Sequence, residues 1–184
     1  MVPIGTTQVS GQSLTCTSGT AVPNPSSNAN LVADCEALLG FKSTLAGRGR
    51  LNWSASRAMT GWDGITISGG RVTEIGLSSK GLTGSIPAGI GDLSGLTAIY
   101  MASNDLGGSI PSSVGNLSNL RHLNLALNEI RRPLPSQLGN LSNLETLHLT
   151  GNYFLQSLPS WIGNLTSLRE LGMSGTGLLG NIPS

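Results

Sequence analysis

The feature that most constrains the fold is a 24-residue repeat that runs without insertion from Val72 to Ser184. Aligned at that period, the chain gives the lines VTEIGLSSKGLTGSIPAGIGDLSG, LTAIYMASNDLGGSIPSSVGNLSN, LRHLNLALNEIRRPLPSQLGNLSN, LETLHLTGNYFLQSLPSWIGNLTS and LRELGMSGTGLLGNIPS. The same residue types recur in fixed columns, including a proline column: Pro87, Pro111, Pro135, Pro159 and Pro183. A period of this length indicates a solenoid, in which each repeat packs only against its neighbours.

Each column has a physical role within the repeat. The first, fourth and sixth positions are apolar, as in Leu120, Leu123 and Leu125, and the residues between them alternate outward as in a short strand. Asn128 follows where the chain leaves the strand, and a buried amide there can satisfy backbone groups that the bend leaves unpaired. The later Gly-Asn-Leu portion predicts a short turn of helix or 3₁₀ helix that returns to the next strand.

The pattern L-x-x-L-x-L-x-x-N-x-L is typical of leucine-rich repeats. We therefore expect an α/β repeat solenoid: a right-handed coil with a parallel β-sheet inside and 3₁₀ or short helical segments outside. About five repeats fill residues 72–184, and the last one is truncated. The end of the coil would expose apolar residues around Met173, Leu178 and Ile182, which predicts packing against further repeats or self-association.

Two segments precede the repeats. Residues 1–27 are rich in Ser, Thr, Gly, Asn and Pro, and they predict an extended, loosely ordered leader. Residues 28–71 predict an N-terminal cap, because apolar residues recur at helical spacing up to Leu45 and a hairpin pattern follows around Gly69 and Gly70. Gly47 is expected to close the helix, and the cap is expected to shield the apolar end of the first repeat.

Charge and composition exclude several partners. The net charge is +1 and charged residues make up 10% of the chain, so there is no basic footprint for nucleic acid and no polybasic membrane patch. The apolar runs are too short to span a bilayer. The opening residues MVPIGTTQ lack the charged and apolar regions of a signal peptide, so a secreted form would have had its signal removed.

Cys16 and Cys35 are the only cysteines in the chain. An even pair without metal-ligand companions predicts a disulfide in a secreted protein, and two free thiols in a reducing compartment are the alternative. The bridge would tie the leader to the cap helix and would stabilise the fold by about 3 kcal/mol for a loop of this size.

Cap and repeats together resemble the plant-type extracellular leucine-rich repeat family, which includes receptor-like kinase ectodomains and polygalacturonase-inhibiting proteins. The resemblance covers about residues 31–184 and rests on the L-x-G-x-I-P of the repeats and on these cap residues: Asp34, Ala37-Leu38-Leu39, Phe41-Lys42, Trp53, Trp62-Asp63-Gly64-Ile65-Thr66 and Gly70-Arg71-Val72. The family's cap usually has cysteines where this chain has Thr60-Gly61 and Ile67-Ser68. The resemblance implies an extracellular recognition module and not a catalyst.

The residues themselves give little support for catalysis. His122 and His148 fall on outward strand positions of neighbouring repeats, but no carboxylate or cysteine shares their columns in those repeats to complete a zinc site. No serine lies in a nucleophile-elbow context, and no glycine-rich stretch has phosphate-loop spacing. Glu74 and Glu170 share a column but lie four repeats apart, too far for paired-carboxylate chemistry. We therefore predict no enzyme activity, no metal and no cofactor.

We predict a protein- or peptide-binding module, similar to a receptor ectodomain or to an inhibitor. The inner strand face is the expected ligand site, through Tyr100, Arg121, His122, Asn124 and His148. Tyrosine and arginine are over-represented in binding hot spots, and histidines add a pH response. The alternative is a flank where the repeat pattern breaks without a packing reason, which consists of Arg131, Arg132, Tyr153, Leu155 and Trp161.

Two other functions stay open from the sequence alone: binding to an extended surface such as polysaccharide or ice, and a structural or adhesive role. The outward columns mix Thr97, Arg121 and Glu145, which argues against ice. The sequons are candidate glycosylation sites, at Asn52, Asn116, Asn140 and Asn164. Three of them arise from the repeat consensus, for which turn chemistry is the simpler interpretation.

Overall fold

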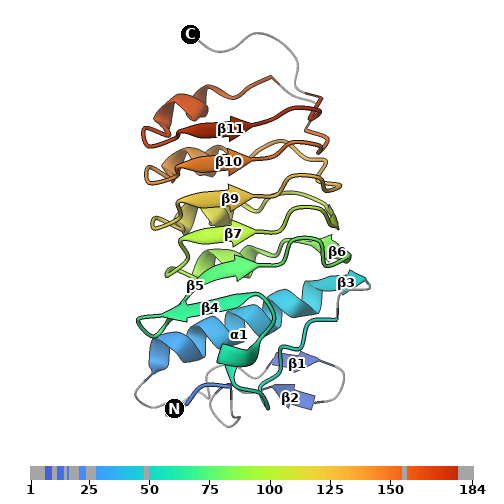
Figure 1. Cartoon of the computed structure of the whole chain (residues 1–184), viewed down its shortest axis with the longest axis vertical. Coiled ribbons are helices and arrows are strands. Elements are labelled where there is room, and N and C mark those ends of the chain that lie inside the picture. Colours follow the sequence, from blue (N-terminus) through green and yellow to red (C-terminus); the bar gives the residue numbers. More distant parts are fainter. Residues whose placement is uncertain are drawn as a thin grey trace.

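The protein is a solenoid whose inner face is a stacked β-sheet (Figure 1). The computed structural model describes residues 7–9, 12–14, 16, 21–23, 28–47, 50–154 and 157–177. The inner sheet consists of β4 (Ile65–Ser68), β5 (Arg71–Gly76), β7 (Ala98–Tyr100), β9 (His122–Asn124), β10 (Thr146–His148) and β11 (Glu170–Gly172), in the order β11-β10-β9-β7-β5-β4. All neighbours pair in parallel except β4 and β5, which confirms the predicted parallel sheet.

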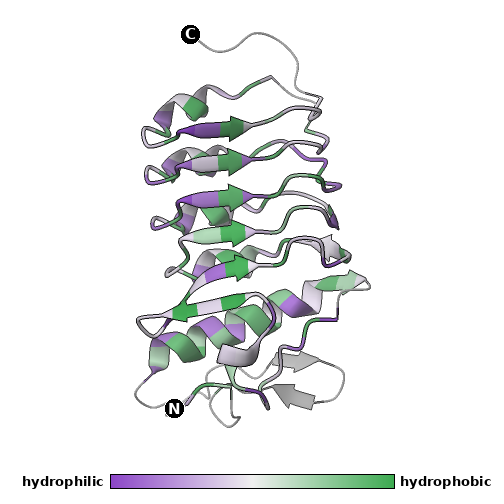
Figure 2. Cartoon of the chain, viewed as in Figure 1, coloured by the Kyte–Doolittle hydropathy of each residue, from purple (hydrophilic) through white to green (hydrophobic). Residues whose placement is uncertain are grey.

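The 24-residue register holds across this sheet. Ile75, Ile99, Leu123, Leu147 and Leu171 pair in succession. The first four are at most 1% exposed, whereas Leu171 in the last described strand is 41% exposed. Figure 2 shows hydrophilic and hydrophobic residues side by side in β9, β10 and β11, because side chains along a strand alternate between solvent and core.

A ladder of buried amides satisfies the backbone where each strand ends. The side-chain Nδ2 of Asn128 donates to the carbonyls of Met101 and Leu125, both at 3.0 Å, and its Oδ1 accepts from the Leu106 N–H at 3.1 Å. The asparagines one repeat before and after make equivalent bonds. Thr176 takes the same column in the last repeat. The expected role of this column is therefore confirmed.

The outer side of the coil is built from short 3₁₀ helices, each of which follows a proline: η2 (Ala88–Asp92), η3 (Ser112–Asn116), η4 (Ser136–Asn140) and η5 (Ser160–Asn164). Glycine lets successive helices approach closely. A Cβ added at Gly115 would lie 2.4 Å from the carbonyl oxygen of Gln137, a distance at which neighbouring atoms must shift. The glycine column therefore sets the spacing of the outer side.

A second, smaller sheet runs along the edge of the coil. It contains β3 (Leu45–Gly47), β6 (Leu82–Ser85) and β8 (Asp105–Gly107), in the order β3-β6-β8. The prediction that Gly47 closes the cap helix is wrong. Gly47 lies in β3 with φ 100°, where a Cβ would lie 2.3 Å from the carbonyl oxygen of Gly81, so the strand pairing requires glycine.

The cap is held on the first repeat by a buried ion pair. Helix α1 (Ala29–Thr44) carries Asp34, which is fully buried. Its carboxylate accepts from Arg71 Nε at 2.9 Å, from Arg71 Nη2 at 2.7 Å and from the Val72 N–H at 2.8 Å. The β4–β5 hairpin beside it turns at Gly69 and Gly70, both left-handed, as the sequence predicts.

The described residues of the leader include a short strand pair that its composition does not predict. Strands β1 (Thr7–Val9) and β2 (Gln12–Leu14) form an antiparallel hairpin. Ala21 is buried, and it donates its N–H to Ala55 and accepts from Met59, the first residue of the 3₁₀ helix η1 (Met59–Gly61). These backbone hydrogen bonds and the disulfide described below hold Ala21 and Cys16 against the cap, which local sequence preferences do not predict.

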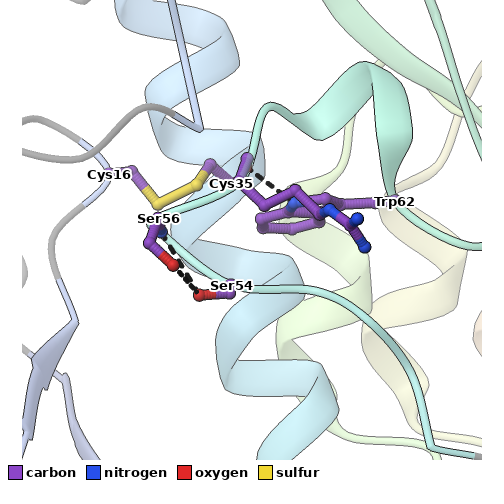
Figure 3. Close-up of a disulfide and its surroundings, with 6 residues drawn as sticks. Cys16, Cys35, Ser54, Ser56 and Trp62 are labelled. Atoms are coloured by element: carbon purple, nitrogen blue, oxygen red, sulfur yellow. Dashed lines mark hydrogen bonds between the residues drawn. A yellow bond between two sulfur atoms is a disulfide. The ribbon is translucent and has the colours of Figure 1, made fainter.

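The predicted disulfide between Cys16 and Cys35 is present, with the two Cα atoms 6.1 Å apart. Figure 3 shows it beside Ser56 and Trp62. Trp62 in turn stacks on Trp53, with ring centroids 5.8 Å apart and an interplanar angle of 12°. The disulfide therefore lies next to the aromatic side chains in the core of the cap.

Candidate binding surface

The inner face presents polar side chains on three neighbouring strands. Strand β7 carries Tyr100, β9 carries His122 and Asn124, and β10 carries His148; all four side chains are half-buried. The parallel register places Tyr100 opposite Asn124 and Asn124 opposite His148. Tyr100, Asn124 and His148 therefore form one row across the sheet, and His122 lies beside this row on β9.

Tyr100 and His122 pack against each other at the β7 end of this row. Their rings stack with centroids 6.3 Å apart and an interplanar angle of 19°, and His122 Nδ1 lies 3.1 Å from Thr146 Oγ1. Burial, and secondly the charge of Glu74, raise the pKa of the Tyr100 phenol. The tyrosine is therefore a neutral donor and acceptor at physiological pH, beside an aromatic surface for a ligand side chain.

Carboxylates reach the histidines from adjacent repeats. His148 Nε2 lies 3.4 Å from Glu170 Oε2. The two residues lie in different columns of the repeat, so comparing residues within one column does not predict this pair. In the register, His122 pairs with Thr146 and His148 with Asn124, so the two histidines are diagonal neighbours. Within the described part of the chain, no group of three or more His, Cys, Asp or Glu residues is arranged to hold a metal.

Arg121 lies at one border of the row and already has a partner. Its Nη1 lies 2.6 Å from Glu145 Oε1, and this hydrogen bond is the main reason why the pKa of Glu145 is lowered. The arginine is largely exposed, so the pair is accessible to solvent and to a ligand. A ligand carboxylate would have to displace Glu145 to use this arginine.

The residues of the predicted flank do not all come together. The Arg131 guanidinium lies 4.9 Å from the centroid of the Tyr153 ring and pairs with the Glu129 carboxylate. Arg132 is exposed beside it, and Leu155 lies outside the described residues. Trp161 lies in η5 on the outer side and packs half-buried against the core, so it belongs to a different surface.

One exposed residue, Leu127, was not predicted from the sequence as a candidate for binding. Leu127 is 56% exposed and has φ 55°, in the left-handed region that disfavours a branched side chain. The sequence could have indicated this position, because the other repeats carry small residues in the same column: Ser79, Ser103, Gly151 and Gly175. A bulky apolar residue in a column of small ones marks the position.

The candidate glycosylation sites differ in what their amides do. Asn52 donates through Nδ2 to the Gly61 carbonyl at 3.0 Å and accepts from the Asp63 N–H at 2.8 Å, so it has a structural role in the cap. The three repeat sequons are exposed at the last residue of each 3₁₀ helix, at Asn116, Asn140 and Asn164. Glycan attachment at some of these sites, though not at all three stacked ones, stays a prediction.

The fold and the surface together define the class of protein: a leucine-rich repeat solenoid with a helical cap and a polar inner face. A family model described as "Leucine rich repeat" matches residues 94–154. In sequence, the chain is 40% identical over 81 residues to "Probable inactive receptor kinase RLK902" from Arabidopsis thaliana, and the match covers 43% of this chain. The chain spans only 12% of that protein's length.

Solved structures agree with this class. A chain in the crystal structure of the BIR3–SERK2 complex from Arabidopsis thaliana is 29% identical, with a TM-score of 0.72 over 80% of this chain and 84% of that chain. The ectodomain of the plant receptor kinase GASSHO1/SCHENGEN3 from the same organism is 32% identical, with a TM-score of 0.73 over 80% of this chain and 19% of that chain. The predicted resemblance to plant receptor-kinase ectodomains is confirmed.

Proposed function

We propose that this chain is an extracellular, non-catalytic recognition module that binds a peptide or protein on its inner face. The observation that carries the proposal is the group of half-buried polar side chains across β7, β9 and β10, with the Tyr100–His122 stack at its β7 end. A fixed row of aromatic and hydrogen-bonding groups binds an extended chain at little entropic cost, because the protein side is already ordered.

The comparisons support this class of ligand. The GASSHO1/SCHENGEN3 ectodomain was crystallised in complex with CASPARIAN STRIP INTEGRITY FACTOR 2. The ectodomain of the Arabidopsis receptor kinase HAESA, which is 26% identical to this chain, was crystallised with an IDA peptide hormone ligand. For this chain we propose a ligand of the same broad kind, a peptide or a protein segment.

An extracellular location fits the chemistry of the cap. Disulfides persist in oxidising compartments, and the Cys16–Cys35 bridge joins the leader to α1. The described residues contain no helix that is both long and apolar enough to cross a bilayer.

The test is a binding selection on the whole chain. A phage-displayed library of random dodecapeptides is selected on the immobilised protein, and the affinities of the recovered peptides are measured for the wild type and for the variant Tyr100→Ala/His122→Ala. We expect the variant to bind at least about tenfold more weakly, which corresponds to about 1.4 kcal/mol. The matched control is Arg131→Ala/Tyr153→Ala, which changes an aromatic and a cationic residue outside the inner face.

Inner-face binding is refuted if every recovered peptide binds the Tyr100→Ala/His122→Ala variant as tightly as the wild type. A parallel titration with cell-wall oligosaccharides separates the alternative class. Saturable binding to oligosaccharides together with no selected peptide would replace the proposal with a carbohydrate-binding function.

A further inference from the structure

The edge of the solenoid just after β9 carries an apolar residue that the fold does not need. Leu127 is 56% exposed and adopts φ 55°. Ser79 and Ser103 hold the same left-handed conformation in earlier repeats, so a small polar residue suffices there. A branched apolar side chain in this conformation costs conformational free energy, and its burial within the chain does not repay that cost in full.

A fixed backbone presents Leu127. Its N–H donates to the Thr150 carbonyl at 2.7 Å, and the next N–H, of Asn128, donates to Gly151. The leucine side chain covers Gly151: a Cβ added at Gly151 would lie 2.8 Å from Leu127 Cδ2. The apolar side chain therefore lies across two repeats at a defined place.

A second exposed apolar side chain, Tyr153, follows two residues after Gly151. It is 46% exposed, its N–H donates to the Ile130 carbonyl at 2.8 Å, and its ring lies 4.9 Å from the Arg131 guanidinium. The ring and the cation hold each other in place. Leu127, Arg131, Arg132 and Tyr153 are called the rim patch below.

The rim patch carries an excess of positive charge. Arg131 uses one side of its guanidinium on Glu129, while Arg132 is exposed and makes no ion pair within the described part of the chain. Two arginines thus face one carboxylate. Both arginines belong to the third repeat, and the next carboxylate in the Glu129 column is Asp105, one repeat closer to the cap.

We propose that the rim patch is a second docking surface, which binds an acidic protein segment with an apolar side chain flanked by aspartate or glutamate. The apolar side chain packs on Leu127 and Tyr153, and the flanking carboxylates pair with Arg132 and with the free side of Arg131. Exposed tyrosine and arginine side chains are enriched in protein interfaces and among binding hot spots, and Leu127 adds apolar area beside them. This surface is distinct from the inner-face row and does not depend on it.

The experiment selects directly for peptides that need Leu127. The same random dodecapeptide library is selected on the wild-type chain with an excess of soluble Leu127→Ser protein, which removes peptides that bind elsewhere. Serine is the residue that Ser103 supplies at this column, so the variant keeps the fold. We expect recovered peptides to share an apolar residue next to Asp or Glu and to bind Leu127→Ser at least about tenfold more weakly.

Two further variants identify the contribution of charge. Arg131→Gln/Arg132→Gln should also bind these peptides about tenfold more weakly and should lose most of the salt dependence seen with the wild type. Tyr100→Ala/His122→Ala should bind them normally. A loss with that inner-face variant would place the peptides on the inner face and would overturn the rim proposal while leaving the proposed function intact.

Two results contradict the proposal outright. One is a selection that yields no peptide dependent on Leu127, or only peptides without acidic residues. The other is sedimentation in which the wild type dimerises and Leu127→Ser stays monomeric, because a second copy of the chain would then be the occupant of the rim patch.

Discussion

Leu125 and Leu127 lie two positions apart in the third repeat, yet their environments are opposite. Leu125 is 1% exposed in the core, and its neighbour is 56% exposed in a left-handed conformation. At the residue scale, the repeat thus separates side chains that hold the coil together from side chains that are available to a partner. Stability and binding are expected to respond to different substitutions.

Replacing Leu127 with glycine should leave the free energy of unfolding unchanged or raise it slightly. The substitution removes the roughly 1–2 kcal/mol cost of a left-handed side chain, against the loss of a partly buried leucine. Leu125→Ala, by contrast, should cost about 2–5 kcal/mol. Urea denaturation measures both, and a loss of more than about 1 kcal/mol for Leu127→Gly would show that this leucine serves the fold.

Glu36 on α1 gives a pH-dependent prediction. Burial raises the pKa of its carboxyl above the ordinary value of 4.5, and its Oε1 has no hydrogen-bond partner within the described residues. With a raised pKa in the folded state, the protonated form is favoured, so stability is lost as the pH rises through that pKa. Glu36→Gln cannot ionise and should raise the Tm at about pH 7 but not at about pH 3.5. Equal Tm shifts at both pH values would contradict this account.

At the element scale, a buried carboxylate holds α1 against β5, beside the β3–β6 pairing that also joins the cap to the first repeat. Asp34 is fully buried and bonds both to Arg71 and to the backbone of Val72. Removing one partner of such a pair leaves an uncompensated group, so Asp34→Ala should lower the free energy of unfolding by about 3–5 kcal/mol.

The exposed pair of Arg121 and Glu145 is the matched control for Asp34. Its atoms lie at a similar distance, 2.6 Å, but the arginine side chain is 58% exposed. Arg121→Ala should therefore change stability by less than about 1 kcal/mol. If chemical denaturation shows equal losses for Asp34→Ala and Arg121→Ala, the cap is not held by the buried pair.

The outer 3₁₀ helices make a second prediction at this scale. A Cβ at Gly115 would lie 2.4 Å from the Gln137 carbonyl oxygen, whereas Gly163, in the same column, has no atom within 4 Å of its added Cβ. Gly115→Ala should therefore cost about 1–3 kcal/mol through overpacking. Gly163→Ala should stay within about 0.5 kcal/mol, and thermal unfolding of both variants compares them directly.

For the whole molecule, the repeat register was predictable because the same residue types recur every 24 residues in each column. The strands, the amide ladder and the Gly69-Gly70 turn follow from spacing and residue type alone. The features that were not predicted depend on residues far apart in sequence. Asp34 and Arg71 are separated by 37 positions, and β3 pairs with β6 although η1, β4 and β5 lie between them in the chain.

The candidate site, likewise, was predictable only where its residues follow the repeat. Tyr100, His122, Asn124 and His148 were predictable as outward neighbours because they follow the strand period. Leu127 was not, because its significance lies in a backbone angle that the sequence shows only as an odd residue in a small-residue column. The flank prediction grouped Trp161 with Tyr153 although the structure separates the two sides of the coil.

Hydroxyl-radical footprinting of the whole chain, with and without a peptide selected for inner-face binding, tests the central claim most directly. The method reports side-chain accessibility, and aromatic residues and histidines react readily. If the inner face binds the peptide, Tyr100, His122 and His148 lose reactivity on binding, while Trp161 on the outer side does not change. If the three inner-face residues keep their reactivity and the protection falls on the 3₁₀ side, the assignment of the inner face as the recognition surface is wrong.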